Sequence, residues 1–365
     1  MDNIYEKYHV AHVINASGKM TILGGSRVCH DVCRHMQLGA SQFFEIKDLL
    51  DQTGSYIADL LGVEAAYIVN SASGGIAQSV ASCVSRGSTR YLFNIHHPEN
   101  KRREIVICKG HNVDYGTPIE VTIGLGGGRV VEAGYANKCT LDHVQAQITE
   151  NTAALIYVKS HHCVQKGMPD MQDFIDLGHQ NGLPVIVDAA AEEDLTKYVH
   201  MGADVVIYSG TKALEGPTSG LIVGKKDFVE QVKKQSQGIG RVMKVGKENI
   251  LGLTYAIERY MTKEHLTLEQ QCQRLEAFHQ KINAIDGLSA RCVQDGAGRQ
   301  IMRSEITFVK VSALEVAQQL KEGDIKIYTR DYRANEGKIE IDIRDVTDEE
   351  LNIIYEKIYE IVRGL

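Results

Sequence analysis

The sequence lacks the features that mark membrane, secreted and nucleic-acid-binding proteins. It contains no uninterrupted apolar run of about 18 residues, the length that a membrane-spanning helix requires. Its opening MDNIYEKYHV is too polar for a secretory signal peptide. Its eight cysteines include no Cys-x-x-Cys pair, so we expect reduced thiols, no metal site and a cytoplasmic location. The net charge of −7 argues against a nucleic-acid partner, and we expect no membrane partner either.

What the sequence contains is an alternation of short apolar strands and amphipathic helices. The 365 residues, 43% hydrophobic and 24% charged, suffice for one large domain and a smaller one. Near-continuous Val- and Ile-rich strands with helical crossovers predict an α/β fold with a mostly parallel seven-stranded sheet that helices cover on both faces. The predicted strands are 65–72, 103–110, 128–134, 153–160, 183–190, 203–210 and 219–226.

The pattern changes after about residue 226. Helical segments come first, and then alternating runs at 305–311, 325–331 and 338–344 predict a half-exposed antiparallel sheet covered by helices. These elements indicate a smaller α+β domain. The expected division is an N-terminal segment, 1–50, that packs with the small domain, a large domain, 51–260, and the small domain, 261–365.

Two residues at predicted strand ends suggest a cofactor site. Asp188 ends the strand in VIVDAA, and Lys212 follows the next strand in VVIYSGTKALEGP. Ligands of open α/β sheets bind beyond the carboxyl ends of strands, so both side chains can point into one crevice. Pyridoxal 5′-phosphate (PLP) needs such a pair, because a lysine bonds covalently to it and an acid keeps its ring nitrogen protonated. The alternative is that Asp188 caps a loop and Lys212 is solvated, but small residues flank both positions.

A serine- and glycine-rich turn provides a place for the cofactor's phosphate. SASGG, residues 71–75, follows a strand and opens a helix, where hydroxyls and backbone N–H groups can hold an anion. Alone this signal is weak, but it gains weight beside the Asp and the Lys. The predicted phosphate contacts are Ser73, Gly74 and Gly75, supplemented by Ser209 and Thr211.

Histidines follow two other predicted strands. His111, in CKGHNVDYG, could stack flat on the cofactor ring or be a hydrogen-bonded loop histidine. His161 lies just beyond AALIYVKS, where it could reach the cofactor side of the crevice and contact the substrate.

The stretch around these residues resembles bacterial selenocysteine synthase, L-seryl-tRNA(Sec) selenium transferase. That family has a lysine in a similar Ser-Gly-x-Lys-x-Leu-x-Gly-Pro context, and its Val-Ile-Asn-Ala-Thr-Gly start resembles VINASG here. The likeness covers most of residues 11–260 and recurs in IEIDIRDVTDEEL near the C-terminus. It implies the PLP fold type I, the aspartate-aminotransferase-like architecture, with Lys212 as the PLP lysine and Asp188 as the partner of the ring nitrogen.

The sequence departs from the transferase itself. It begins almost directly at the Val-Ile-Asn motif, its charge is acidic, and Thr211 stands where the transferase usually has Asp. It is more similar to a branch of D-glucosaminate-6-phosphate ammonia-lyases. That resemblance implies a lyase in which Lys212 abstracts the Cα proton, water is eliminated, and 2-keto-3-deoxygluconate 6-phosphate and ammonia are released.

Two further expectations concern the substrate and the assembly. Arg344, in IDIRDV, resembles the family's Asp-x-Arg and suits a carboxylate, because a guanidinium can bind one in a bidentate manner. The alternative is a surface arginine that ends a strand. Fold type I enzymes usually build the active site at a dimer interface, so the resemblance implies a homodimer or higher homo-oligomer.

Other functions stay open from the sequence alone. They are a selenium transferase that acts on seryl-tRNA, another PLP-dependent amino-acid lyase or racemase, and a non-catalytic PLP-binding protein. Substrate choice depends on a few pocket residues of a shared scaffold.

Overall fold

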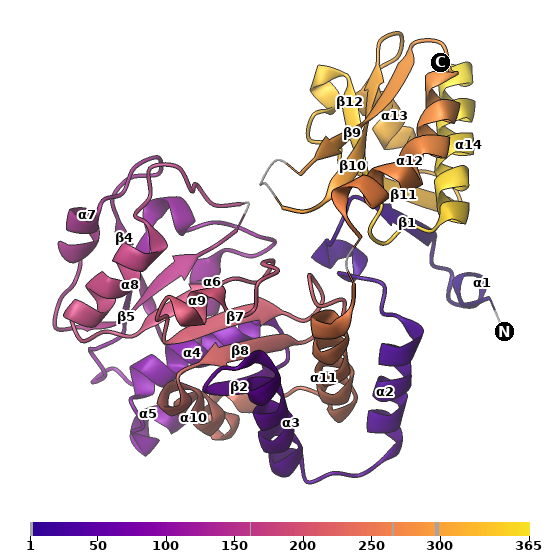
Figure 1. Ribbon diagram of the computed structural model, residues 1–365. Coiled ribbons are helices and arrows are strands. Elements are labelled where there is room, and N and C mark those ends of the chain that lie inside the picture. The colour runs from indigo at the N-terminus through magenta and orange to yellow at the C-terminus, as the bar shows by residue number, and fades with distance from the viewer. Residues whose placement is uncertain (1–2, 161, 265, 296–298) are drawn as a thin grey trace. The chain divides into compact units, whose positions relative to one another are not determined.

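The computed structural model of the protein describes residues 3–160, 162–264, 266–295 and 299–365. The chain forms two compact units (Figure 1). The large unit comprises residues 28–263, and the small unit combines residues 1–27 with 264–365. Within the described residues, no helix is both long and apolar enough to cross a membrane.

The large unit is built on a seven-stranded sheet with the order β2-β8-β7-β6-β5-β3-β4. Only β8 runs antiparallel to its neighbours, β2 and β7. The predicted mostly parallel seven-stranded sheet is therefore confirmed, and each predicted run overlaps one strand. The strands are β2 (Ala65–Val69), β3 (Glu104–Cys108), β4 (Arg129–Ala133), β5 (Thr152–Val158), β6 (Val185–Asp188), β7 (Val205–Ser209) and β8 (Gly220–Gly224).

Helices cover both faces of this sheet because nearly every central strand residue is apolar. Successive strand side chains point to opposite faces, so Val106 and Ile107 join different hydrophobic clusters. One cluster includes residues of α3 (Ile46–Leu61), α8 (Met171–Gln180) and α11 (Lys247–Thr262). The other includes residues of α4 (Ala72–Ser85), α6 (Ile119–Leu125) and α10 (Lys226–Lys234).

Residues 28–50 belong to the large unit, whereas the sequence division assigned them to a segment beside the small domain. The reason is the close packing of α2 (His30–Ser41) against α11. A Cβ on Gly39 would lie 2.8 Å from the Glu248 Cα, and one on Gly252 would lie 2.5 Å from the Met36 Cγ. Only glycine permits such an approach at these two positions.

The small unit contains two sheets. β10 (Met302–Phe308) lies between β12 (Lys338–Asp342) and β9 (Leu288–Gln294) in an antiparallel sheet. β11 (Ile325–Thr329) pairs instead in parallel with β1 (His12–Ala16), so residues 12–16 enter this unit through backbone hydrogen bonds. The expectation that 325–331 joins the antiparallel sheet was wrong for the strand itself, and only Arg330, just beyond β11, makes an isolated antiparallel bridge to Glu340 of β12.

Helices α12 (Leu268–Asn283), α13 (Ala313–Leu320) and α14 (Asp348–Gly364) complete the core of the small unit. The remaining short helices are α1 (Ile4–Tyr8), α5 (Thr89–Phe93), α7 (Leu141–Gln145) and α9 (Lys197–His200), with 3-10 turns η1 (Thr21–Leu23), η2 (Lys109–His111), η3 (Gln235–Gln237), η4 (Ile239–Arg241) and η5 (Ala334–Glu336).

Candidate active site

Asp188 occupies the centre of the carboxyl edge of the large sheet. It is the last residue of β6, paired in register with Val158 of β5 on one side and Ile207 of β7 on the other. Its side chain is buried, and its carboxylate accepts a hydrogen bond of 3.1 Å from the backbone N–H of Ala190. The strands that lead to the other predicted residues are parallel, so their carboxyl ends meet at this edge.

Lys212 lies in a tight turn directly after β7. The Gly210 N–H donates to the Ser219 carbonyl at 2.9 Å, and the Gly216 N–H donates to the Gly210 carbonyl at 2.8 Å. A Cβ on Gly210 would lie 2.1 Å from the Ser219 Oγ, so the turn has no room for another side chain. Lys212 itself is half-buried.

The two predicted catalytic residues influence each other electrostatically. Burial raises the pKa of Asp188 to about 6, although the Lys212 charge and the Ala190 N–H act in the opposite direction. The structure therefore brings together the acid and the lysine that the sequence separates by 24 positions. A buried carboxylate with this environment is strongly stabilised by any cation placed against it.

The serine- and glycine-rich turn opens α4 as predicted, but its glycine amides are already hydrogen-bonded. Ser71 is the N-cap, and its Oγ accepts from the Gly74 N–H at 2.9 Å. The Gly75 N–H donates to the Ser71 carbonyl, also at 2.9 Å. The backbone N–H groups at the start of the helix, from Ala72 and Ser73, are the ones placed to face an anion.

The two glycines instead let α4 approach the sheet. A Cβ on Gly74 would lie 1.9 Å from the Asn70 Oδ1, and one on Gly75 would lie 3.0 Å from the Ile207 Cγ2 on β7. This packing holds the helix N-terminus near the end of β7. There the Ser209 and Thr211 hydroxyls lie 3.2 Å apart, within hydrogen-bonding distance of each other.

His111 lies in η2, directly after β3, and its side chain is fully buried. Its ring meets the Tyr157 ring edge to face, with centroids 4.5 Å apart. Burial lowers the pKa of His111 to about 4, so the imidazole is neutral at physiological pH. His161 lies outside the described residues. The pKa of its neighbour His162 is lowered by burial and then by the charge of Lys212.

Tyr115 lies beside the candidate site, and the sequence pattern did not single it out. Its hydroxyl lies 2.9 Å from the Thr122 Oγ1 and also hydrogen-bonds the Ser73 side chain. Burial raises the pKa of Tyr115, and the charge of Asp188 adds to this effect. The one feature of the sequence that could have pointed to Tyr115 is its position in the loop after β3, four residues beyond His111.

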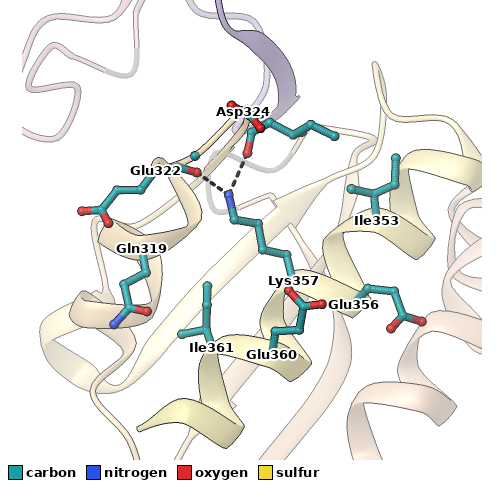
Figure 2. A pocket seen from close by; sticks show the side chains of 10 residues that line it. Gln319, Glu322, Asp324, Ile353, Glu356, Lys357, Glu360 and Ile361 are labelled. Carbon is teal, nitrogen blue, oxygen red and sulfur yellow. Dashed lines mark hydrogen bonds between the residues drawn. The ribbon is translucent and has the colours of Figure 1, made fainter.

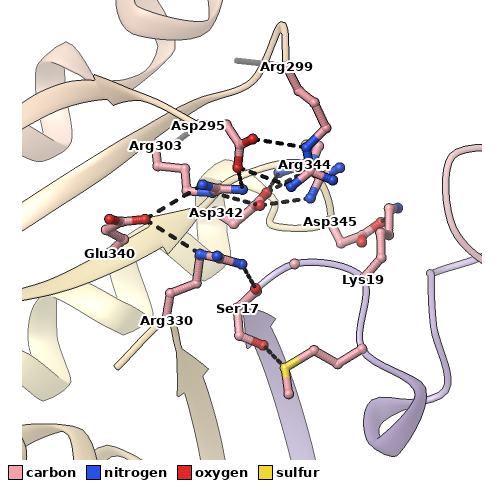
Figure 3. A network of polar contacts seen from close by, with 12 residues as sticks. Ser17, Lys19, Asp295, Arg299, Arg303, Arg330, Glu340, Asp342, Arg344 and Asp345 are labelled. Carbon is pink, nitrogen blue, oxygen red and sulfur yellow. Dashed lines mark hydrogen bonds and ion pairs between the residues drawn. The ribbon is translucent and has the colours of Figure 1, made fainter. Parts of the chain in front are cut away.

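Arg344 belongs to the small unit, where it follows β12. Its Nε and Nη2 each donate to the Asp342 carboxylate at 2.9 Å, and 24% of its side chain is exposed (Figure 3). The guanidinium is thus held in a fixed bidentate arrangement and can still be reached from solvent.

A cavity of about 490 Å³ in the small unit is a poor place for an anionic substrate. Glu322, Glu356 and Glu360 line it (Figure 2). Lys357 donates to the backbone carbonyls of Leu320, Glu322 and Ile325 at 3.2, 2.5 and 2.7 Å, and so caps the C-terminus of α13. These three hydrogen bonds indicate that Lys357 has a structural role.

Comparison with known proteins gives a consistent family. The model of the L-seryl-tRNA selenium transferase family matches residues 50–314. D-glucosaminate-6-phosphate ammonia lyase from Salmonella typhimurium (strain 14028s / SGSC 2262) is 44% identical, with 98% of each chain covered. A 5′-C-glycyluridine monooxygenase-decarboxylase from Streptomyces sp is 39% identical, with coverage of 93% of this chain and 87% of that protein.

A solved structure of D-glucosaminate-6-phosphate ammonia-lyase superposes with a TM-score of 0.94 over 100% of this chain and 99% of the other. L-seryl-tRNA(Sec) selenium transferase from Aquifex aeolicus (strain VF5) is more distant, at 24% identity. The fold is that of PLP fold type I enzymes, and the family uses PLP. The chain belongs to the L-seryl-tRNA selenium transferase family of PLP-dependent enzymes.

Proposed function

We propose that the protein is a PLP-dependent ammonia-lyase that converts D-glucosaminate 6-phosphate to 2-keto-3-deoxygluconate 6-phosphate and ammonia. The observation that carries this proposal is the full-length match to a lyase with this name, in sequence at 44% identity and in structure at a TM-score of 0.94. The pairing of Asp188 with Lys212 at the strand ends supports the same chemistry.

The residues at this edge of the sheet fit PLP. Lys212 supplies the amine, Asp188 a buried acid for the ring nitrogen, and the start of α4 a place for the phosphate. Ser73, Ser209 and Thr211 offer hydroxyls to that phosphate, and Gly74 and Gly75 allow the close packing that positions it. Bound PLP supplies an electron-withdrawing ring that makes the substrate's Cα proton acidic.

Lys212 carries the proton transfers. With PLP bound, Lys212 would hold the cofactor through its amine, and the same amine would take the proton from C2 of the bound substrate. Asp188 would keep the ring nitrogen of bound PLP protonated, and this cationic nitrogen would withdraw the negative charge that develops at C2. Loss of the C3 hydroxyl as water, followed by hydrolysis of the product, releases the keto acid and ammonia. One water leaves and one is taken up, so the atoms balance.

Arg344 binds the substrate carboxylate in this proposal. Its bidentate hydrogen bonds to Asp342 fix the plane of the guanidinium, and its exposed part is accessible to a ligand. His111, neutral and buried beside Tyr157, supports the face of the cofactor ring. His161 is proposed to contact the substrate beyond β5.

The 39% identical relative has a different name, so the test must distinguish the two reactions. Purified protein with PLP would be given D-glucosaminate 6-phosphate, and keto acid, ammonia and dissolved oxygen would be measured together. The proposal expects equal amounts of keto acid and ammonia with no oxygen uptake, and no product from the Lys212→Ala variant. Absence of keto acid from the wild-type protein, or oxygen uptake that matches product, would refute it.

We also propose a cytoplasmic homodimer or higher homo-oligomer. Four apolar side chains within residues 38–46 are 37–100% exposed. Such a concentration of exposed apolar side chains is typical of a surface that another protein chain covers. The four are Leu38, Phe43, Phe44 and Ile46. The eight cysteines are all free, as suits a reducing compartment. A fully active species that elutes as a monomer in sizing chromatography would contradict the assembly.

A further inference from the structure

Arg303 is a buried arginine that the proposed reaction does not yet use. It lies on β10, and its side chain is 2% exposed. It forms ion pairs with Asp295 at 2.6 Å and with Asp342 at 3.2 Å. A buried guanidinium is costly unless carboxylates compensate its charge, so its position calls for a reason beyond packing.

Asp342 connects Arg303 to Arg344. Arg303 and Asp342 are register partners across β10 and β12, so the backbone ladder fixes their separation. The Asp342 Oδ2 accepts from the Arg303 Nε at 3.2 Å and from the Arg344 Nη2 at 2.9 Å. The Asp342 side chain has no exposed surface. Burial alone would raise the pKa of Asp342, but Arg344 and Arg303 outweigh it and lower the pKa to about 2.

Arg303, Asp342 and Arg344 belong to a larger cluster of ion-paired side chains in the small unit, which we call the guanidinium network (Figure 3). This network carries more positive than negative charge. Four guanidiniums face three carboxylates among its described residues, which leaves one positive charge in excess. An anion that reaches the exposed part of Arg344 would balance it. The network consists of Arg299, Arg303, Arg330, Arg344, Asp295, Glu340 and Asp342.

The N-terminal segment limits where Arg344 can go. Gly18 has a φ of +92° and lies against the Asp342–Arg344 pair. A Cβ on Gly18 would lie 2.9 Å from the Asp342 Oδ2 and 3.1 Å from the Arg344 Nη2. Backbone on one side and Asp342 on the other leave the guanidinium little freedom, which reduces the entropy that binding would cost.

We infer that Arg303 is a positioning residue that acts through Asp342 to hold Arg344 in the orientation that binds the substrate carboxylate. This inference rests on the proposed function. Arg303 touches no substrate. It keeps Asp342 charged and in place, and Asp342 in turn orients Arg344. Without Arg303, Asp342 would lose one of its two arginine partners and keep only Arg344. Its carboxylate could then rotate, and the Arg344 guanidinium, which is hydrogen-bonded to it, would change orientation as well.

The test compares ligands with and without the carboxylate. The KM for D-glucosaminate 6-phosphate is measured beside the inhibition constant of 2-amino-2-deoxyglucitol 6-phosphate, in which a hydroxymethyl group replaces the carboxylate. In Arg303→Met we expect KM to rise about tenfold, the effect of weakening one charged hydrogen-bonded contact, while kcat and the inhibition constant stay nearly constant. A merely structural role would move both ligands together.

Arg333→Met is the matched control, because Arg333 pairs with Glu305 and Glu336 in the same unit. We expect it to leave the KM unchanged. Should Arg303→Met not fold, the double variant Arg303→Met with Asp295→Asn removes both partners of the buried Arg303–Asp295 pair, which generally costs less than leaving one charge unpaired. Arg299 then loses its ion pair with Asp295, but its side chain is 23% exposed and can be solvated. The same selective rise in KM is expected.

The possible failures are distinguishable. Wild-type protein without keto acid formation refutes the proposed function and this inference with it. Normal wild-type turnover with an unchanged KM in the folded Arg303 variant overturns the inference alone. An equal loss of affinity for both ligands also overturns it, because the effect would then be independent of the carboxylate.

Discussion

Asp188 in the large unit and Asp342 in the small unit are both buried acids at strand ends, yet their environments act in opposite directions. Burial raises the pKa of Asp188 to about 6 in spite of Lys212. For Asp342, Arg344 and Arg303 outweigh the same burial and lower the pKa to about 2. Burial alone therefore does not identify a functional acid. Asp342 is neutralised by the fold itself, whereas Asp188 is suited to a cationic ligand such as a pyridinium ring.

The largest expected effect is on stability in the small unit. Asp342→Asn removes the carboxylate between two guanidiniums, which should lower the free energy of unfolding by about 3–5 kcal/mol. Urea denaturation at neutral pH measures it. Because the folded-state pKa is lowered, the contribution of Asp342 is present above about pH 4 and is lost as the pH falls toward 2. An equally stable Asp342→Asn variant would remove the contrast between the two acids.

Asp188→Asn should affect catalysis instead. An amide cannot keep the ring nitrogen protonated, so we expect kcat to fall about 10²–10³-fold, the size of losing one preorganised electrostatic group. Steady-state keto acid production measures this, with the cofactor content determined in parallel. Retention of full activity in a PLP-loaded variant would mean that Asp188 is only a structural acid.

The same substitution should stabilise the cofactor-free protein. The folded-state pKa of Asp188 is raised, so its favourable contribution is present below about pH 4 and is lost as the pH rises through 6. At pH 8, the free energy of unfolding of the cofactor-free Asp188→Asn variant should therefore exceed that of the cofactor-free wild-type protein by on the order of 3 kcal/mol. Denaturation at pH 4 and pH 8 gives the comparison. If the variant were less stable than the wild-type protein at pH 8, the favourable contacts of the Asp188 carboxylate would outweigh the cost of burying its charge.

The smallest expected effect concerns Arg344→Lys. A lysine keeps the charge but cannot make two parallel hydrogen bonds to Asp342 and bind a carboxylate in a fixed plane. We expect about a tenfold rise in KM with little change in kcat, a difference of about 1.4 kcal/mol. An unchanged KM would show that Arg344 is a surface arginine that only completes the network.

The sequence predicted the large sheet well because its strands are almost entirely buried and apolar. β9 was missed, since its residues are largely exposed or half-buried and have no clear alternation. The pairing of β1 with β11 joins segments more than 300 residues apart, and no local pattern specifies such a partner. The packing of α2 against α11 through Gly39 and Gly252 places residues 28–50 in the large unit. A glycine adds nothing to a hydrophobic pattern, so the sequence did not reveal this contact.

The candidate site divides in the same way. Asp188 and Lys212 could be predicted because each follows an apolar strand. Tyr115 lies in a loop without periodicity, and Arg303 in MRSEITF looks like an ordinary exposed arginine of a half-exposed strand. The burial of Arg303 becomes evident only when β9 and β12 place Asp295 and Asp342 around it.

Visible absorbance of the purified protein after addition of PLP, compared with that of Lys212→Ala, tests directly whether Lys212 holds the cofactor. We expect an absorbance band of lysine-bound cofactor in the wild-type protein, altered by D-glucosaminate 6-phosphate and absent from the variant. A wild-type protein without this band, or a Lys212→Ala variant that retains it, would contradict the assignment of Lys212 and the site built around Asp188.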